Sequence, residues 1–287
     1  MHNFEYEYIM KVTEINMEAK VLNEARLKLK NANRIVIKVG TSTLAYSETR
    51  KLNLSRIDHL IREIADLHNS GKEIIFVSSG AIAAGIGKMG LPGKPDTVPE
   101  NQALAAIGQG VLMHIYEKFF AEYGKTMAQL LLTGNDTVDE HARENSRNSL
   151  KTILKMGVIP VINENDAVAT DELRIGDNDN LSALVATMIE AEVLIILTDI
   201  DGVYTGNPKT DESAKLIDEI KEITPEIENI AGGAGTKLGT GGMYTKIQAA
   251  KIAKSAGITT LIVKGSDNDV LRRCLQGEKI GTIFPAN

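Results

Sequence analysis

The sequence contains a single cysteine, Cys274, and only five histidines among its 287 residues. One cysteine excludes an internal disulfide, and the histidines are too scattered to form a cluster spaced like a zinc site. The composition therefore gives no support to thiol catalysis or to a structural zinc centre.

Long apolar runs and positive charge are also scarce. No apolar run approaches the roughly 20 residues that a membrane-spanning helix needs. The first residues include Glu5 and Glu7, where a secretory signal would have basic residues before an apolar stretch. The net charge of −6 argues against a broad nucleic-acid surface. We expect a cytoplasmic protein that binds neither membranes nor nucleic acids, and that focuses a few lysines in one cleft if its substrate is anionic.

Apolar runs alternate with helical patterns from Arg34 onward. Strands that alternate with helices predict βαβ units and a mostly parallel sheet with helices on both faces, an open αβα sandwich of the α/β class. The predicted strands cover residues 35–39, 74–77, 127–131, 158–162, 193–197 and 259–263. The predicted helices cover residues 55–68, 104–120, 143–155, 181–189 and 244–256, with others beside Ala83, and residues 270–275 and 279–284 add a last helix and strand in a βαβ-like edge.

Polar residues collect directly after the predicted strands. In parallel α/β sheets, ligands bind outside the carboxyl ends of the strands, so these positions indicate the site. They are residues 38–42 (KVGTS), 78–80 (SSG), 163–166 (NEND) and 198–202 (TDIDG), together with the glycine-rich stretch 232–242, which opens the helix that contains Lys246.

Each of these segments also has a plain structural explanation. Lys38 could extend to solvent, Ser78 or Ser79 could cap a helix, and the glycine-rich stretch could be a flexible linker. That stretch, however, leads directly into a helix start with a lysine, the combination that a phosphate site needs. The acidic and amide residues at 163–166 and 177–180 exceed what turns and caps require, which leaves some of them to bind a ligand, a metal or lysines.

Two nucleotide-binding motifs are matched only superficially. Gly85, Gly87 and Gly90 fit GxGxxG, but they lie several residues beyond the strand that ends at Val77, whereas a dinucleotide site needs the first turn after the strand. The GKT triplet at 124–126 lacks the first glycine of a P-loop and precedes a strand. Neither motif predicts a site.

Six motifs in order resemble the amino acid kinase family and, within it, the glutamate 5-kinases. The resemblance covers about residues 34–285 and implies the amino acid kinase fold. The motifs are IKVGTS (37–42), VSSGAIAAG (77–85), VINENDAV (161–168), GDNDNLSA (176–183), LTD with DGVY (197–204), and GTGGM (239–243) followed by Thr245 and Lys246.

The resemblance implies ATP-dependent phosphorylation of the γ-carboxylate of L-glutamate, the first step of proline biosynthesis, with ATP and Mg²⁺ as cofactors. Lys38 and Lys246 would contact the phosphates, and Asp179 would hold their two ammonium groups in place. Glutamate would be bound by Ser79, Asn163, Asp166 and Asn178, with Asp177 in support. The nucleotide would be bound by Lys38, Gly40, Thr198, Asp199, Thr240, Gly241, Gly242, Met243, Tyr244, Thr245 and Lys246. We assign no side chain as a metal ligand, because most ligands of Mg²⁺ can come from the phosphates.

The resemblance also implies a division of the chain. Residues 1–32, which are amphipathic over 19–29, form an N-terminal extension, and residues 33–287 form the amino acid kinase domain. Its substrate lobe covers about 33–192 and its nucleotide lobe about 193–287. Many bacterial members continue into a C-terminal PUA module, whereas this sequence stops after the kinase fold. We expect a homo-oligomer, with proline as a feedback inhibitor.

Three alternatives remain open. Another acid kinase of the same fold, such as an acetylglutamate kinase, would share both lysines but should not place a carboxylate beside an acylated nitrogen. A non-catalytic nucleotide or glutamate sensor is disfavoured by the intact Lys38, Asp179 and Lys246. A dinucleotide-dependent oxidoreductase is disfavoured by the missing fingerprint.

Overall fold

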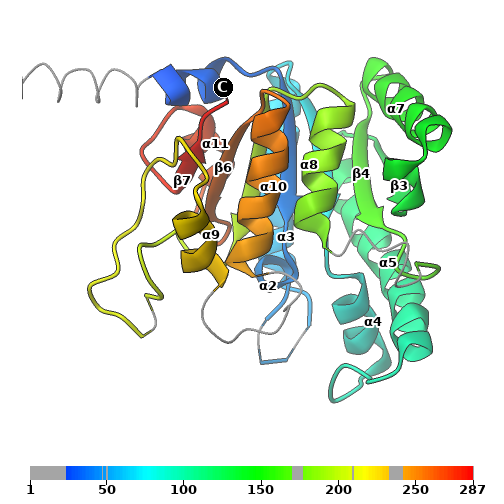
Figure 1. Cartoon of the computed structure of the whole chain (residues 1–287). Coiled ribbons are helices and arrows are strands. Elements are labelled where there is room, and N and C mark those ends of the chain that lie inside the picture. Colours follow the sequence, from blue (N-terminus) through cyan, green and yellow to red (C-terminus); the bar gives the residue numbers. More distant parts are fainter. Residues whose placement is uncertain are drawn as a thin grey trace, which may run out of the picture.

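The computed structural model describes residues 24–46, 48–49, 51–169, 177–208, 210–232 and 242–286. They form a seven-stranded sheet in the order β3-β4-β2-β1-β5-β6-β7, with helices on both faces (Figure 1). The first six strands run parallel, and β7 runs antiparallel to β6. The predicted α/β class with a mostly parallel sheet is confirmed, but the βαβ-like edge predicted for the last helix and strand is wrong.

The central strands are buried on both faces of the sheet, as parallel strands between two helical layers must be. Their continuous apolar runs made them visible in the sequence, and each of the six parallel strands lies within two residues of its predicted bounds. The strands are β1 (Arg34–Val39), β2 (Glu73–Ser78), β3 (Met127–Leu132), β4 (Ile159–Glu164), β5 (Val193–Thr198), β6 (Thr259–Lys264) and β7 (Thr282–Phe284).

Two helical layers cover the sheet. Helices α3 (Leu54–Asn69), α4 (Ala81–Met89), α5 (Val98–Glu122) and α11 (Val270–Leu275) share one core cluster with Ile35 and Ile37 of β1. Helices α7 (Glu140–Lys155), α8 (Asn178–Met188) and α10 (Met243–Ser255) share the other with Val36. Alternate residues of one strand thus serve opposite layers.

In Figure 1, α8 and α10 lie side by side in front of the sheet and α3 lies behind it. The shorter helices are α2 (Thr41–Leu44), α6 (Asn135–Val138) and α9 (Pro225–Gly232), and α9 packs against α10. None of the helices in the described part of the chain is long and apolar enough to cross a membrane.

Part of the expected N-terminal extension packs onto the body of the fold. Residues 24–31 are helical, and Ala25 and Leu29 are buried in the same core cluster as α3. The guanidinium of Arg26 donates to the carbonyl oxygens of Glu278 at 2.5 Å and Ile280 at 3.2 Å. Residues 1–23 lie outside the described residues. One sheet runs through both expected lobes, and the division of the chain stays a prediction.

Helices α4 and α5 cross in direct backbone contact. A Cβ atom on Gly108 would lie 1.8 Å from the carbonyl oxygen of Ala81, and one on Gly85 would lie 2.1 Å from that of Leu104. No side chain larger than hydrogen fits at either position. Gly85, one of the GxGxxG glycines, therefore serves helix packing, and the crossing fixes α5 beside the start of α4.

Candidate active site

The sheet order creates a switch point at β1. The chain passes from β1 to β2 on one side, and after β4 it crosses to β5 on the other side. Crevices for ligands form at the carboxyl ends of strands where the order reverses in this way. The carboxyl ends of β1, β2, β4 and β5 bring Lys38, Ser79, Asn163 and Thr198 to this edge, as the sequence predicted.

Asp179, in the first turn of α8, lies between two lysines. Its Oδ1 atom is 2.6 Å from Nζ of Lys38, which comes from β1, and its Oδ2 atom is 3.1 Å from Nζ of Lys246, which comes from the first turn of α10. The hydroxyl of Thr245 donates to the same Oδ2 at 2.8 Å. The structure thus brings together the three residues predicted to be catalytic. Lys38 is 5% exposed, so the alternative that it extends to solvent is wrong.

The three charged groups leave a buried excess of positive charge, two ammonium groups against one carboxylate. Burial alone would raise the pKa of Asp179, but the charges of Lys38 and Lys246 outweigh it and hold the pKa below its ordinary value. Burial lowers the pKa of Lys38, Asp179 opposes this shift, and Lys246 adds to it. A buried cationic excess of this kind favours an anion with several oxygens.

The N-terminus of α8 is capped by Asp177, so its neighbours are available for other contacts. The carboxylate of Asp177 accepts from the N–H of Asn180 at 2.9 Å. Burial raises the pKa of Asp177, and the nearby Asp179 adds to this shift. The supporting role expected for Asp177 fits this position. One acidic residue of the GDNDN motif serves as the cap, while Asn178 and Asp179 face the site.

A chain of side-chain amides links the residues predicted to bind glutamate. Asn178 Nδ2 donates to Oγ of Ser79 at 3.0 Å and to Oδ1 of Asn163 at 2.8 Å. Asn163 Nδ2 in turn donates to Oε1 of Gln109 at 2.8 Å. Three of the four predicted residues are therefore in direct contact, and α5 supplies a fourth member that the sequence analysis missed. The glycine before it, Gly108, was the available signal, because a glycine inside a long helix marks close backbone approach.

The serines after β2 do not cap α4. The cap position is Gly80 with φ of 100°, and in the described part of the chain no side chain caps this helix. The hydroxyl of Ser78 is hydrogen-bonded at 2.6 Å to that of Tyr116, and Ser79 faces Asn178. The capping alternative for this motif is wrong, which leaves Ser79 for a ligand.

Asp166 lies in the turn after β4 and lines a cavity of about 300 Å³. Gln109 lines the same cavity from α5, and Gln129 lines it from β3. Asp166 and Gln109, which is hydrogen-bonded to Asn163, therefore face one cavity with space for a small ligand.

The residues predicted to bind the nucleotide lie on the other side of Lys38. Gly40 occupies the cap position of α2, and a Cβ atom there would be 3.6 Å from Nζ of Lys38, so this backbone lies close to the ammonium group. Thr198 ends β5, and its hydroxyl donates to the exposed carboxylate of Asp199 at 3.1 Å.

The N-terminus of α10 lies at the same region, because Thr245 and Lys246 near its start both contact Asp179. Gly242 holds the cap position, and Met243 and Tyr244 form the first turn, with Tyr244 48% exposed. A helix N-terminus with a lysine in its first turn is a favourable place for phosphate. The predicted residues Thr240 and Gly241 lie outside the described residues.

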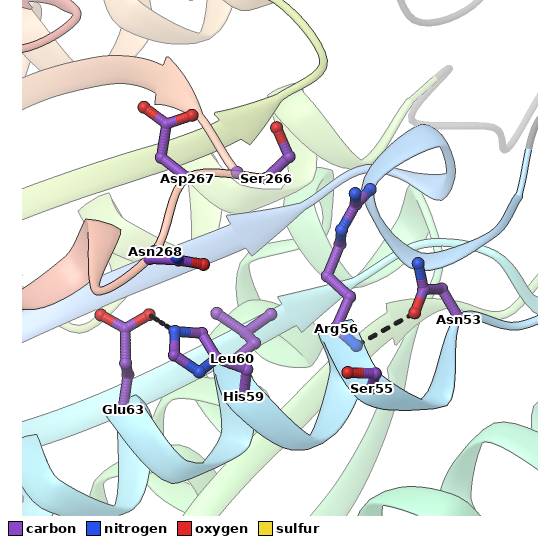
Figure 2. Close-up of a pocket in the computed structure, with 10 residues that line it drawn as sticks. Asn53, Ser55, Arg56, His59, Leu60, Glu63, Ser266, Asp267 and Asn268 are labelled. Carbon is purple, nitrogen blue, oxygen red and sulfur yellow. Dashed lines mark hydrogen bonds and ion pairs between the residues drawn. The ribbon is translucent and has the colours of Figure 1, made fainter.

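A second pocket, of about 280 Å³, lies between α3 and the loop after β6 (Figure 2). Its polar groups hold the fold together: Glu63 accepts from the backbone N–H groups of Leu271 at 2.8 Å and Arg272 at 3.1 Å, and His59 lies 3.6 Å from Glu63. Glu63 therefore caps α11. None of the predicted site residues lines this pocket among the described residues.

The described residues contain no group of three His, Cys, Asp or Glu side chains placed to hold a metal ion. The oxygens of Asp179 are already engaged by the two lysines. In ATP sites, Mg²⁺ is usually coordinated by phosphate oxygens and by only a few protein ligands. The arrangement here fits an ion that binds together with the nucleotide.

Residues 33–264 match the amino acid kinase family. The chain belongs to this family. A glutamate 5-kinase of Clostridium tetani is 54% identical over 258 residues, which cover 90% of this chain and 96% of the relative. One of Moorella thermoacetica is 53% identical over 261 residues, which cover 91% of this chain and 69% of the relative. The predicted resemblance to the glutamate 5-kinases is confirmed.

The fold of this amino acid kinase also matches solved structures at low sequence identity. The structure of an isopentenyl phosphate kinase aligns with a TM-score of 0.63 and 18% identity, over 88% of this chain and 99% of that chain. This likeness supports the fold.

Proposed function

We propose that this amino acid kinase is a glutamate 5-kinase, which transfers the γ-phosphoryl group of ATP to the side-chain carboxylate of L-glutamate. The products are L-glutamyl 5-phosphate and ADP. The observation that carries the proposal is the buried arrangement of Lys38, Asp179 and Lys246 at the switch point of the sheet. The glutamate 5-kinases that resemble nearly the whole chain support the choice of acceptor.

The chemistry requires positioning and charge stabilisation more than a reactive protein group. A carboxylate is ionised at neutral pH, so an oxygen of glutamate can attack the γ-phosphorus without a general base, while the bond to the β-phosphate oxygen breaks and ADP leaves. The obstacle is repulsion between an anionic acceptor and a triphosphate. Two ammonium groups held by one carboxylate offset this repulsion, and they are already in place before the reaction.

The positions of the side chains support the following residue roles. Lys38 and Lys246 contact the transferred phosphoryl group, and Asp179 keeps the two ammonium groups at a fixed separation. Glutamate binds on the side of Ser79, Asn163, Asn178 and Asp166. The nucleotide binds on the side of Gly40, Thr198, Asp199 and the start of α10, from Gly242 to Lys246.

Mg²⁺ bound to the phosphates would neutralise part of their charge during the transfer. Asp177 and Asp199 lie next to the site residues Asn178 and Thr198 in the sequence, and they are candidates for a direct or water-mediated ligand. The protein's own contribution is the placement of the lysines.

Regulation and assembly follow from the resemblance. Proline carries the same α-amino and α-carboxyl groups as glutamate, so it would compete for the glutamate pocket beside Asn163 and Asp166. Raising glutamate should then reverse inhibition by proline, whereas raising ATP should not. A crystal with proline bound far from Asn163 and Asp166 would contradict this. The homo-oligomer and the cytoplasmic location stay predictions.

An assay of ADP release with a panel of amino acids tests the function. We expect release that depends on L-glutamate, together with an acyl phosphate that hydroxylamine traps as the hydroxamate. ADP release without trapped product would indicate only ATP hydrolysis. Glutamate binding without turnover would instead support the sensor, and acetylglutamate as the preferred acceptor would support the other acid kinase.

A further inference from the structure

The orientation of the amide chain at the site is fixed by a backbone group. The N–H of Glu164 donates to Asn163 Oδ1 at 2.9 Å. A backbone N–H can only donate, so this atom of Asn163 must be its oxygen, and the other must be its nitrogen. That nitrogen donates to Gln109 at 2.8 Å, so the atom of Gln109 in this contact must be Oε1. The Nε2 group of Gln109 must therefore face away from Asn163.

The Nε2 group of Gln109 is buried and has no hydrogen-bond partner among the described residues. It carries two N–H donors. Buried donors in native proteins are almost always paired, with protein, water or a ligand. Gln109 lines the cavity of about 300 Å³ that Asp166 also lines. The unpaired donor thus belongs to a residue at the edge of a space large enough for part of a small ligand.

The charge pattern of this cavity suits one end of an amino acid. Asp166 and Glu164 both line it with carboxylates, and that of Asp166 can accept from an α-ammonium group. None of the described residues that line the cavity is Lys, Arg or His, so an α-carboxylate there needs a neutral donor. Gln109 is the lining amide with a buried and unpaired donor. At the other end of the amide chain, Asn178 Nδ2 donates to the carbonyl oxygen of Ser78 at 3.3 Å. This contact fixes the orientation of the Asn178 amide and leaves its Oδ1 atom as an acceptor.

We propose that Gln109 is a specificity-determining residue that donates from Nε2 to the α-carboxylate of the amino-acid substrate. This assignment rests on the proposed function. The α-groups are bound between Gln109 and Asp166, and the side-chain carboxylate extends toward Lys38 and Lys246. Gln109 also accepts a hydrogen bond from Asn163, so one side chain both positions the amide chain and binds the α-carboxylate of the substrate.

The test adds a negative charge at residue 109 and removes one from the α-carboxylate of the substrate. Gln109→Glu keeps an oxygen for Asn163 but presents a carboxylate to the substrate. The substrates are L-glutamate and its α-carboxamide, L-isoglutamine, which keeps the γ-carboxylate that is phosphorylated. We expect the wild type to have a higher kcat/KM for glutamate than for isoglutamine. In Gln109→Glu, kcat/KM for glutamate should fall by at least about tenfold, mainly through a higher KM. The preference for glutamate over isoglutamine should then become smaller or reverse. The KM for ATP should stay within about twofold, since the nucleotide side is untouched.

Two further variants separate specificity from folding. Gln109→Met removes the N–H donors without adding charge, so it should lower kcat/KM for glutamate without making isoglutamine the preferred substrate. Gln276→Leu makes a similar change at an exposed residue beside α11 and should leave both substrates unaffected. An unchanged ratio between the two acids in folded Gln109→Glu, or a rise in the KM for ATP equal to that for glutamate, would overturn the assignment.

A binding measurement keeps this test independent of turnover. If the wild type releases no ADP with glutamate, the proposed function fails. The assignment of Gln109 is then judged by the thermal stabilisation that millimolar glutamate gives to the wild type and to Gln109→Glu. Stabilisation of the wild type alone supports it, and equal stabilisation of both proteins, or of neither, overturns it.

Discussion

The Asp179 carboxylate lies 2.6 Å from the Lys38 ammonium group, and both side chains are buried. Buried ion pairs contribute little to net stability, because the loss of hydration offsets the attraction. This pair therefore needs another explanation. The second oxygen of Asp179 contacts Lys246, so one carboxylate keeps two cations together that would otherwise repel each other. Their combined charge is available to a substrate.

Replacing either lysine should reduce turnover sharply. Lys38→Ala and Lys246→Ala should each lower kcat by about 10²-fold or more, because each removes a preorganised donor from the transferred phosphoryl group. Steady-state kinetics measures this, with circular dichroism to verify folding. Lys118→Ala, at an exposed position of α5, is the matched control and should turn over like the wild type. Wild-type kcat in a folded Lys38→Ala or Lys246→Ala would contradict the assignment.

Removing the charge of Asp179 should cost stability as well as activity. Asp179→Asn leaves two buried ammonium groups without their carboxylate, and breaking a buried pair in this way costs about 3–5 kcal/mol. Urea denaturation gives the free energy of unfolding. Glu117→Gln, an exposed neutralisation on α5, should change it by no more than about 0.5 kcal/mol.

The pH dependence of this difference follows from the pKa of Asp179. The folded-state pKa lies below the ordinary value of 3.8, so the carboxylate stabilises the fold at every pH above that value and loses this effect only as the pH falls through the folded-state pKa. The gap in unfolding free energy between wild type and Asp179→Asn should therefore not shrink as the pH is lowered from about pH 7.5 to pH 5. A gap that shrinks steadily over this interval would show that the carboxyl group titrates there.

The crossing of α4 and α5 makes opposite predictions for two glycines of one helix. Gly108→Ala should destabilise the fold by about 1–3 kcal/mol or more, because its Cβ atom would lie 1.8 Å from the Ala81 carbonyl oxygen. Gly110→Ala should be neutral or stabilise by up to about 1 kcal/mol, since no described atom other than those of its chain neighbours and its own helix backbone lies within 4 Å of its Cβ position. Thermal and urea unfolding measure the stability of both variants relative to the wild type. Equal stability of the two variants would show that the helices can separate at no cost.

The strands and the site edge were predictable because parallel strands covered on both faces have continuous apolar runs that end where polar residues begin. Lys38, Ser79, Asn163 and Thr198 could be placed at one edge on this basis. The direction of β7 could not, because the alternation of side chains is the same for either direction. Helix α11 has six residues and spans about 9 Å, too short to return the chain along a strand of about 20 Å for parallel pairing.

Gln109 was not predicted as a site residue for a different reason: the signal from its neighbour Gly108 indicates close packing of the helix but not which side chain that packing brings to the site. Gln109 lies in the middle of a long helix, where the residue type indicates only a polar position. Its contact with Asn163 exists because two glycines let α5 approach α4, which is a property of packing between segments. The short helices α2, α6 and α9 were missed because four to eight residues are too few to establish a helical period.

The enzyme should strongly prefer free L-glutamate to N-acetylglutamate. Asp166 lies in the polar run after β4, beside the cavity lined by Gln109, and it is suited to an α-ammonium group. Acetylation removes the charge of that group and two of its donors. The carboxylate then loses a charged partner, which costs about 1–3 kcal/mol or more and gives at least about fivefold discrimination in kcat/KM. Asp166→Asn should lose activity with glutamate and narrow this discrimination. Equal use of the two acids, or unchanged glutamate kinetics in Asp166→Asn, would show that the α-ammonium group binds elsewhere.

Aspartate should be rejected by position rather than by binding. It keeps both α-groups but is one methylene shorter than glutamate, so when these groups are bound near Gln109 and Asp166 its side-chain carboxylate falls roughly 1 Å or more short of the phosphorus. A misplacement of that size can cost about 10²-fold in rate. Aspartate should therefore act as a competitive inhibitor against glutamate with very low kcat. A KM effect alone, with kcat for aspartate close to that for glutamate, would mean that the α-groups do not set the distance to the two lysines.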